Sequence, residues 1–463
     1  MRTFLRGRLG ARTLTFIAFE TCVILAAVVT VTHAWLGEEA PDTAGEWPKW
    51  LLIAAVTQFC LYYADMYDTR IIRDRRLLFV RAMYALGATS FIFSLLYSKP
   101  FFPDMFIDDG VFVITSLCLV TTILGWRIAF EWANRHVAPR ERLLLVGTTK
   151  GAVDLAQELY DRSDLGAEIV GFIDPDPARL GAAVINPGVV GTIEDIPTLV
   201  RAMSVDRVVV SLADARGSLP MDKLLEMRLD GVTFDHMATV YEQYTGKIAV
   251  ENLRPSWLIF SSGFRKGRLL LTSKRVLDLA AAIIGVILAL PLLILTALAV
   301  RLDSPGPILY RQQRVGQHGR LFNLFKFRSM RQDAEANTGA VWCAEGDTRI
   351  TRVGRFIRRT RLDEIPQLWN VLRGDMSLVG PRPERPEFVG SLAREIPFYG
   401  QRHTVKPGLT GWAQVSYSYA GSVDGTMEKL QYDLFYIKNL SLPLDLFIMF
   451  CTAKIVLLGK GAR

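Results

Sequence analysis

The longest apolar stretch of the chain limits the folds that are open to it. Residues 276–300 read VLDLAAAIIGVILALPLLILTALAV. A helix of about 20 apolar residues spans the hydrocarbon core of a bilayer, so this stretch predicts a membrane segment. Lys and Arg are frequent on both sides of it, at 265–275 and at 301–331. Because basic flanks stay in the cytoplasm, a straight crossing would place one flank on the wrong side.

Pro291 lies in the middle of this stretch. Proline removes one helical hydrogen bond and clashes with the preceding turn, so Pro291 predicts a break between two helical arms. We therefore expect a re-entrant helical hairpin at 276–300 that dips into the inner leaflet and returns to the cytoplasm. The alternative is a full crossing with the C-terminal domain outside the cytoplasm.

Four further apolar stretches have roughly the length of a spanning helix, and they lie at 13–36, 50–67, 79–98 and 111–131. The connector 68–81 holds five basic residues, whereas 37–49 and 99–110 hold one each. The positive-inside bias then places both ends of a four-helix transmembrane bundle, residues 1–138, in the cytoplasm. Glu20, inside the first stretch, is either functional or hydrogen-bonded across a helix interface.

From Arg142 the pattern changes to short strand-like runs that alternate with helical ones, as in RLLLVG, AVDLAQELYDR and DRVVVSL. Such alternation is typical of a parallel sheet with crossover helices, so residues 139–260 are predicted to form a Rossmann-like cytoplasmic α/β domain. Its first turn, GTTKG at 147–151, lacks the three-glycine spacing of a dinucleotide fingerprint. A structural or regulatory domain, including a dimerisation surface, is the alternative to nucleotide binding.

Positive charge is concentrated just after the membrane stretch. Residues 301–385 hold sixteen Lys and Arg against nine Asp and Glu, and the whole chain has a net charge of +8. Aromatic residues are not interleaved with these cations as base-stacking platforms, and no nucleic-acid motif is present. The charge therefore favours lipid headgroups and phosphorylated small molecules over nucleic acid.

Asp363 and Glu364 are adjacent in TRLDEIPQLWN, residues 360–370, with Arg358 close before them. Neighbours on a helix point about 100° apart, so these two acids cannot share one role as an i,i+4 pair does. A carboxylate among cations is held ionised and is a competent nucleophile or metal ligand. Ordinary surface salt bridges are the alternative.

Two other clusters supply cations. FKFRSM, at 325–330, alternates like a strand and would place Lys326 and Arg328 on one face; an edge strand is the alternative. GPRP, at 380–383, is a rigid turn or a plain loop that displays Arg382. Arginine binds phosphate through its planar fork. Hard oxygen ligands beside phosphates favour Mg²⁺ over zinc, in keeping with the lack of a Cys/His cluster.

Three stretches resemble the bacterial polyprenyl-phosphate glycosyl-1-phosphate transferases, the monotopic phosphoglycosyl transferases. They are KRVLDLAAAIIGVILALPLLILTALAVRLDSPGPILYRQQRVGQHGRLFNLFKFRSM, RTRLDEIPQLWNVLRGDMSLVGPRP and VKPGLTGWAQV, all within 265–463. The bundle and the Rossmann-like domain before them resemble the large subgroup, which includes undecaprenyl-phosphate galactose and glucose phosphotransferases. The end of the chain, from Lys429, is similar to exopolysaccharide sugar transferases associated with exosortase systems.

The resemblance implies a monotopic α/β catalytic domain over 265–463 and a two-step reaction that begins the synthesis of exopolysaccharide, capsule or O-antigen. A UDP-sugar gives its sugar-1-phosphate to an aspartate with release of UMP, and undecaprenyl phosphate then takes it. The family nucleophile falls on Asp363, with Glu364 as its partner for Mg²⁺ or for protons. The phosphate-holding positions fall on Lys326, Arg328, Arg358 and Arg382, with Arg314 in the QQRVG turn as a further candidate. Smaller members place Ser-Pro at the hairpin break, where this chain has Leu290-Pro291.

The predicted partners are a UDP-sugar, undecaprenyl phosphate, membrane lipid and a second copy of the chain in a homodimer, at the bacterial inner membrane with the catalytic domain on its cytoplasmic face. Two other functions stay open. A membrane-attached nucleotide-sugar dehydratase or epimerase would use NAD and a Tyr-x-x-x-Lys pair, for which Tyr244 and Lys247 have the wrong spacing. A scaffold for polysaccharide assembly would need no catalytic residues.

Overall fold

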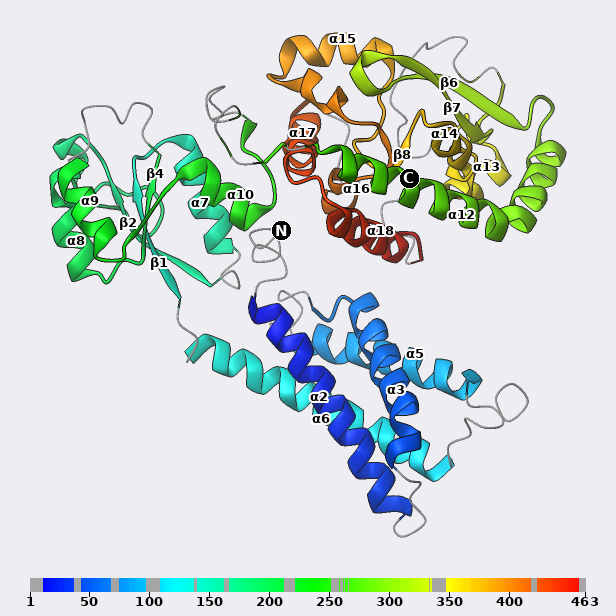
Figure 1. The fold of residues 1–463 in the computed structure, drawn as a ribbon, viewed down its shortest axis with the longest axis horizontal. Helices are drawn as coiled ribbons and strands as arrows, with labels where there is room; N and C mark the ends of the chain where they lie inside the picture. Colours follow the sequence, from blue (N-terminus) through cyan, green and yellow to red (C-terminus); the bar gives the residue numbers. More distant parts are fainter. Residues whose placement is uncertain are drawn as a thin grey trace. The chain divides into compact units, whose positions relative to one another are not determined.

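The computed structural model contains two compact units, Arg2–Asp235 and His236–Arg463 (Figure 1). The structure describes residues 11–36, 43–67, 75–96, 109–136, 140–161, 166–211, 221–250, 258, 261, 263–264, 266–332, 334, 347–417 and 423–457. The second unit begins at His236, whereas the sequence analysis predicted that the Rossmann-like domain continues to residue 260.

The first unit begins with four long helices, which are α2 (Ala11–Leu36), α3 (Thr43–Tyr63), α5 (Arg75–Leu96) and α6 (Asp109–His136). They coincide with the four apolar stretches and share one core, to which Ile24, Trp50, Ala82 and Ile123 each contribute from a different helix. Among the helices in the described ranges, only α12 of the second unit is long and apolar enough to cross a membrane. The transmembrane assignment of the other four stays a prediction.

Glu20 forms an ion pair inside this helical core. Its Oε1 lies 2.8 Å from Nη2 of Arg127, and both side chains are fully buried. The hydroxyl of Tyr67 donates to Glu20 Oε2 at 2.5 Å, and Arg127 also donates to the carbonyl of Met66. These contacts join α2 to α6, which favours the helix-interface reading of Glu20.

A five-stranded sheet of order β3-β2-β1-β4-β5 follows in the same unit. The elements are β1 (Glu141–Val146), α7 (Lys150–Asp161), β2 (Ala167–Ile173), β3 (Val189–Gly191), α8 (Ile196–Ala202), β4 (Arg207–Val210), α9 (Met221–Leu229) and β5 (Thr233–His236). Strand β1 pairs in parallel with β2 and β4, and β2 pairs in parallel with β3. The predicted parallel sheet is therefore confirmed.

Helices cover both faces of this sheet, with α8 and α9 on one side and α7 on the other (Figure 1). Leu144 and Val146 pack into the core with α8 and α9, and the alternate residues Leu143 and Leu145 are also fully buried. A continuous apolar run is what a strand buried on both faces requires. Beyond the end of β1, the hydroxyl of Thr148 donates to Asp174 at 2.6 Å.

The second unit contains two small sheets and a set of helices. The main elements are α10 (Met237–Thr245), α12 (Arg268–Asp303), β6 (Leu309–Val315), β7 (Leu321–Phe327), α13 (Arg352–Arg359), α14 (Gln367–Arg373), β8 (Ser377–Val379), α15 (Pro386–Glu395), β9 (Gly408–Thr410), α16 (Trp412–Ser416), α17 (Val423–Lys438) and α18 (Leu442–Leu457). Two short 3₁₀ turns, η8 (Leu362–Glu364) and η9 (Tyr399–Thr404), carry functional side chains. The pair β6–β7 is antiparallel and β8–β9 is parallel.

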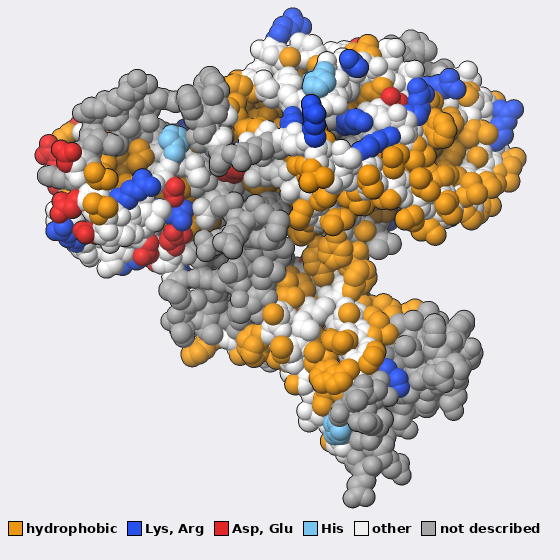
Figure 2. All heavy atoms as spheres, viewed as in Figure 1, with side chains coloured by type: hydrophobic (Ala, Val, Ile, Leu, Met, Phe, Trp, Pro, Cys, Tyr) orange, Lys and Arg blue, Asp and Glu red, His pale blue; other side chains and the backbone are white. Residues whose placement is uncertain are grey.

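Helix α12 is continuous from Arg268 to Asp303 and contains Pro291. The break into two arms that Pro291 predicted is therefore not confirmed. Proline deletes one donor from the ladder, and the turns on either side keep their own hydrogen bonds. Hydrophobic side chains gather along the face of the unit that carries α12 (Figure 2).

The first half of α12 is fastened to the second unit by buried polar contacts. Lys274 donates to Asp445 of α18 at 2.8 Å and to the carbonyl of Val379 at 3.0 Å. One turn further, Oδ1 of Asp278 accepts from the Ser377 hydroxyl and from the backbone N–H of Leu378, both at 3.0 Å. These contacts fix α12 against the start and the end of β8.

The far end of α12 contacts the same unit. Val300 packs with Phe327 and Ile357 in a small core. Asp303 accepts from the backbone N–H of Val353 at 3.0 Å, next to the N-terminus of α13. Both ends of the apolar helix are thus bound to one compact unit.

Helix α10 is docked on α17 within the second unit. Glu242 pairs with Lys438 at 2.5 Å, and Lys247 pairs with Glu428 at 3.1 Å. Trp412 donates its indole N–H to the carbonyl of Gly246 at 2.8 Å. Lys247, which the sequence analysis compared with the Lys of a Tyr-x-x-x-Lys pair, therefore binds α17 through Glu428.

Candidate active site

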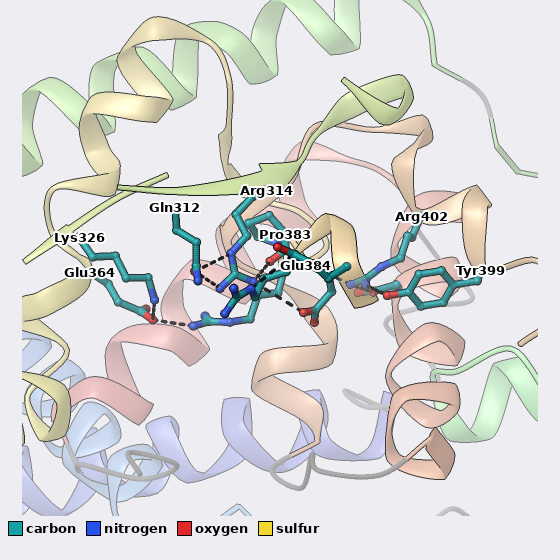
Figure 3. A network of polar contacts seen from close by, with 12 residues as sticks. Gln312, Arg314, Lys326, Glu364, Pro383, Glu384, Tyr399 and Arg402 are labelled. Atoms are coloured by element: carbon teal, nitrogen blue, oxygen red, sulfur yellow. Dashed lines mark hydrogen bonds and ion pairs between the residues drawn. The ribbon is translucent and has the colours of Figure 1, made fainter. Parts of the chain in front are cut away.

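The β6–β7 hairpin presents polar side chains on one face. Its register pairs Tyr310 with Lys326, Gln312 with Leu324 and Arg314 with Phe322. Because side chains on a strand alternate between faces and directly paired residues share one, Arg314 and Lys326 lie on the same face. The hairpin thereby directs both cations toward the unit's acidic residues (Figure 3).

A tight reversal after α13 positions the two adjacent acids. Arg361 has φ of +60°, the left-handed conformation that commonly ends a helix. The chain then enters η8, which contains both Asp363 and Glu364. Their side chains leave this short turn in different directions, so each meets its own surroundings, as the spacing predicted.

The GPRP turn is backed by β9, which is the Gly-Leu-Thr segment of the KPGLTGW stretch. Gly380 donates to the carbonyl of Thr410 at 2.9 Å, and Gly408 donates to the carbonyl of Pro381 at 2.9 Å. A Cβ on Gly380 would lie 2.4 Å from the carbonyl oxygen of Lys406. Glycine is therefore required for the two backbones to approach this closely. Their contact fixes the backbone from which the Arg382 side chain extends.

Three cations surround Glu364, one of which, Lys326, is labelled beside it in Figure 3. Its Oε1 lies 2.6 Å from Nη2 of Arg382, 3.3 Å from Nζ of Lys326 and 3.8 Å from Nη1 of Arg361. Burial alone would raise the pKa of Glu364, but Arg382 and Lys326 outweigh burial and hold that pKa well below its usual range. Glu364 is therefore a permanent anion that is locked in place.

Asp363 has a different environment. Its side chain is 7% exposed, and within the described ranges its carboxylate accepts no hydrogen bond. Burial and the adjacent Glu364 raise the pKa of Asp363, while Lys326, Arg358 and Arg382 act in the opposite direction. A desolvated carboxylate without hydrogen bonds keeps its lone pairs for reaction, so Asp363 has the properties of a nucleophile.

The acids also fit a magnesium ion. All three cations contact Oε1 of Glu364, which leaves Oε2 and both oxygens of Asp363 available to a metal. In the described part of the chain, no three His, Cys, Asp or Glu side chains are grouped to hold a metal by themselves. This donor set matches Mg²⁺, which takes one or two carboxylates and completes its shell with water and substrate phosphates.

The structure brings together most of the residues that the sequence singled out. Asp363, Glu364, Lys326 and Arg382 contact one another or lie close, and the charge of Arg358 acts on Asp363. Within the described residues the guanidinium of Arg358 donates no hydrogen bond, so its fork is available to a phosphate. These side chains come from β7, α13, η8 and the GPRP turn.

Arg314 supports this cluster from the side. Its Nη1 donates to the carbonyl of Pro383 at 3.0 Å, and its Nη2 donates to Gln312 at 2.6 Å. Burial lowers the pKa of Arg314 to about 10, which still leaves it charged at neutral pH. Arg314 holds the backbone of the GPRP turn, whereas the sequence had assigned it to phosphate.

Arg328 lies apart from the cluster. Its guanidinium is buried and donates to the carbonyls of Ser304, at 2.6 Å, and Pro305, at 3.0 Å. The last carbonyls of a helix have no partner within it, so Arg328 satisfies the C-terminal end of α12. The expected shared face with Lys326 fails because β7 ends at Phe327.

Several supporting residues were absent from the sequence prediction. Arg361 joins the cations around Glu364. Asn370 is fully buried, accepts from the N–H of Phe325 at 3.1 Å and donates to the carbonyl of Asn323 at 2.7 Å, so it fastens α14 to the strand of Lys326. A polar residue at a buried helical position was the available signal for Asn370.

Replacement of Lys326 by Met should move the acid limb of the rate–pH profile to higher pH. Lys326 lowers the pKa of both acids, and its loss raises both. An Asp363 that acts as a nucleophile must be ionised, so the rate of the reaction it carries out would fall as pH drops through its pKa. Initial rates of the purified enzyme across pH measure the shift, with Lys454→Met in α18 as the control. An unchanged acid limb would contradict the placement of Lys326 beside the acids.

Comparison with known proteins identifies two matching families. A family model described as Bacterial sugar transferase matches residues 269–459, and one described as CoA-binding domain matches residues 63–221. The first match contains every residue of the acid–cation cluster.

Curated relatives match across both units. UDP-N-acetylgalactosamine-undecaprenyl-phosphate N-acetylgalactosaminephosphotransferase from Aeromonas hydrophila is 43% identical over 263 residues, 57% of this chain and 61% of the relative. Undecaprenyl-phosphate glucose phosphotransferase from Komagataeibacter xylinus is 32% identical over 379 residues, 74% of this chain and 69% of the relative. UDP-glucose:undecaprenyl-phosphate glucose-1-phosphate transferase from Escherichia coli (strain K12) is 32% identical over 366 residues, 76% of this chain and 75% of the relative. The chain therefore spans about three fifths to three quarters of the length of these relatives.

Proposed function

Because this chain belongs to the family of bacterial sugar transferases that act on undecaprenyl phosphate, we propose that it transfers a sugar-1-phosphate from a UDP-sugar to undecaprenyl phosphate through a covalent intermediate on Asp363. The products are UMP and the diphosphate-linked lipid sugar, the first lipid intermediate of exopolysaccharide, capsule or O-antigen synthesis. One observation carries the covalent route. Asp363, a buried carboxylate that accepts no hydrogen bond from the described residues, lies beside the buried anion Glu364 and a set of cations that can bind phosphate.

In the first step, an oxygen of Asp363 attacks the phosphorus that carries the sugar. A phosphorus–oxygen bond to Asp363 forms, and the bond from that phosphorus to the bridging oxygen breaks. The bridging oxygen leaves with its electron pair as part of UMP. Arg358, Lys326 and Arg382 stabilise the negative charge that spreads over the phosphate oxygens in the transition state.

In the second step, a phosphate oxygen of undecaprenyl phosphate attacks the same phosphorus. A new phosphorus–oxygen–phosphorus bridge forms, and Asp363 leaves as a carboxylate. Because the two substrates react in turn, the site never has to hold the nucleotide and the polyprenyl chain together. Glu364 keeps its charge throughout and orients Arg382 and Lys326 toward the phosphates.

Mg²⁺, when bound, supplies positive charge to the diphosphate of the donor. Oε2 of Glu364 and the carboxylate of Asp363 are the protein groups that would hold it. Arg382 and Lys326 would remain on Oε1 of Glu364, since the metal and the cations use different oxygens.

We also propose that α12 is re-entrant, with the second unit on the cytoplasmic face of the inner membrane. The exposed middle of the helix is apolar, and Ile287, Leu288, Ile294 and Leu295 are among its most exposed side chains. Both ends are bound to the same unit, so a helix that enters the bilayer must bend along its length to return to the side on which it began. This geometry would place Asp363 near the headgroup depth of the lipid phosphate. The four N-terminal helices would add a transmembrane anchor, and a homodimer is the expected assembly.

Release of UMP from a panel of UDP-sugars tests this function. Protein in nanodiscs with Mg²⁺ and undecaprenyl phosphate should release UMP with one preferred sugar and convert the lipid phosphate to a lipid diphosphate sugar. Polyprenol without a phosphate is the acceptor control. Failure of every donor in a folded preparation would favour the scaffold function, and dehydration or epimerisation of the UDP-sugar in the presence of NAD would favour the dehydratase or epimerase.

A further inference from the structure

A buried ion pair lies behind the GPRP turn, outside the reacting cluster. Nη2 of Arg402, in η9, donates to Oδ2 of Asp433 in α17 at 2.9 Å and to the carbonyl of Arg382 at 2.9 Å. Its Nη1 donates to the hydroxyl of Tyr399 at 2.7 Å. The side chains of Arg402 and Asp433 are 5% and 3% exposed. Arg402 and Tyr399 lie at one side of this network, and Glu364 and Lys326 at the other (Figure 3).

We propose that Arg402, oriented by Asp433, is a positioning residue for the transferase reaction. It holds the backbone of Arg382 so that the guanidinium of Arg382 meets Glu364 and the donor phosphates. This inference rests on the proposed function, because it assigns a role within the same site. Arg402 contacts neither of the two acids, so it acts only through Arg382.

The GPRP turn depends on donors from elsewhere in the unit. Pro381 and Pro383 have no backbone N–H, so the turn contributes few donors of its own. The carbonyl of Pro381 accepts from the N–H of Gly408, and the carbonyl of Glu384 accepts from the N–H of Val315 at 3.0 Å. Between these two anchors, the carbonyls of Arg382 and Pro383 are each held by a guanidinium. Four consecutive carbonyls are thus held by donors from three segments, namely β9, η9 and β6.

Arg402 differs from the other three donors to this turn because it is a buried charge that needs a buried counter-ion, Asp433. Two backbone N–H groups serve Pro381 and Glu384, and half-buried Arg314 serves Pro383. The carbonyl of Arg382 is held by a charge that has been taken out of water together with its counter-ion. Such a pair is often replaceable by apolar residues without loss of stability. Besides its bond to Asp433, Arg402 donates to the carbonyl of Arg382, and the side chain of Arg382 binds Glu364. This link to the acid–cation cluster gives a reason for a charged pair at this position.

The paired variant Arg402→Met with Asp433→Leu separates positioning from folding. It removes both charges at once and leaves no lone buried ion, so the unit should keep its unfolding midpoint. The donor to Arg382 is lost, and a displacement of about 1 Å at a catalytic group costs up to roughly 100-fold in rate. We expect kcat/KM for UMP release to fall about 10- to 100-fold. Arg402→Lys, which has a single ammonium, should retain part of the activity.

Lys438→Met with Glu242→Leu is the matched control. It removes another buried ion pair of the same helix α17, one that reaches α10 and makes no contact with the turn. The control should keep the rate of the parent. Equal losses in both paired variants would overturn the proposal.

Hydrogen exchange of the peptide covering 377–384 gives a readout without substrate. Exchange there should accelerate in the Arg402 variants and stay unchanged in the control. A parent enzyme that released no UMP would defeat the proposed function, while unchanged exchange in the Arg402 variants would defeat the positioning role. The two failures are therefore distinguishable.

Discussion

Replacement of Asp363 by Asn is expected to lower UMP release by at least about 1,000-fold, because the amide cannot form the phosphate ester on which both steps depend. The protein should remain folded. The pKa of Asp363 is raised in the folded state, so its ionised form opposes folding at pH values above that pKa. An unfolding midpoint equal to or above that of the parent at neutral pH is therefore expected, as measured by thermal unfolding of the detergent-solubilised protein.

Asp154→Asn provides the matched control, since Asp154 is exposed in α7 of the first unit. It should leave both UMP release and the unfolding midpoint unchanged. Retained activity in Asp363→Asn, or a folding defect large enough to explain its loss, would remove the assignment of Asp363 as nucleophile.

Replacement of Arg382 by Lys is expected to lower kcat/KM by roughly 100-fold. Lysine keeps the charge but loses the planar fork, so it cannot bind Glu364 and a donor phosphate oxygen in the same geometry. Removal of one preorganised donor from a transition-state site typically costs about 100- to 1,000-fold. Initial rates over a range of UDP-sugar concentrations separate the effect on kcat from that on KM. Arg394→Lys, on α15, is the control and should leave kcat/KM unchanged, because among the described residues the guanidinium of Arg394 contacts only the carbonyl of Gly390.

A double-mutant cycle sharpens this test. Arg382 and Glu364 share a 2.6 Å contact, so their replacements should not add. The combination of Arg382→Gln with Glu364→Gln should be about as slow as the slower single variant. Fully additive losses would mean that the two side chains act independently, which would contradict a functional contact between Arg382 and Glu364.

The site could be predicted from the sequence wherever a residue type determines the chemistry locally. Adjacent carboxylates on one turn predicted two different roles, and the structure places Asp363 and Glu364 in opposite electrostatic settings. Lys326 could be assigned because strand periodicity extends to its position. The same periodicity failed for Arg328, because the end of β7 depends on contacts with α12 that lie 24 residues earlier in the chain.

Long-range contacts explain the other differences. Arg402 stands in an unremarkable stretch, and its role depends on Asp433 and Arg382, which are 31 and 20 residues away. Helix α10 was grouped with the Rossmann-like domain because the pattern changes smoothly there, but its ion pairs reach residues more than 180 positions further along. The apolar stretches also located the four N-terminal helices, with ends that differ by up to seven residues. Such local patterns cannot report which distant side chain completes a site.

The mass of the intact protein after incubation with a UDP-sugar and no lipid acceptor tests the covalent route most directly. We predict an added mass equal to one sugar-1-phosphate, stoichiometric release of UMP, and mapping of the adduct to the peptide that contains Asp363. Addition of undecaprenyl phosphate should remove the adduct and yield the lipid diphosphate sugar. An unmodified protein that releases UMP only when the acceptor is present would contradict the covalent intermediate and indicate direct transfer between the two substrates.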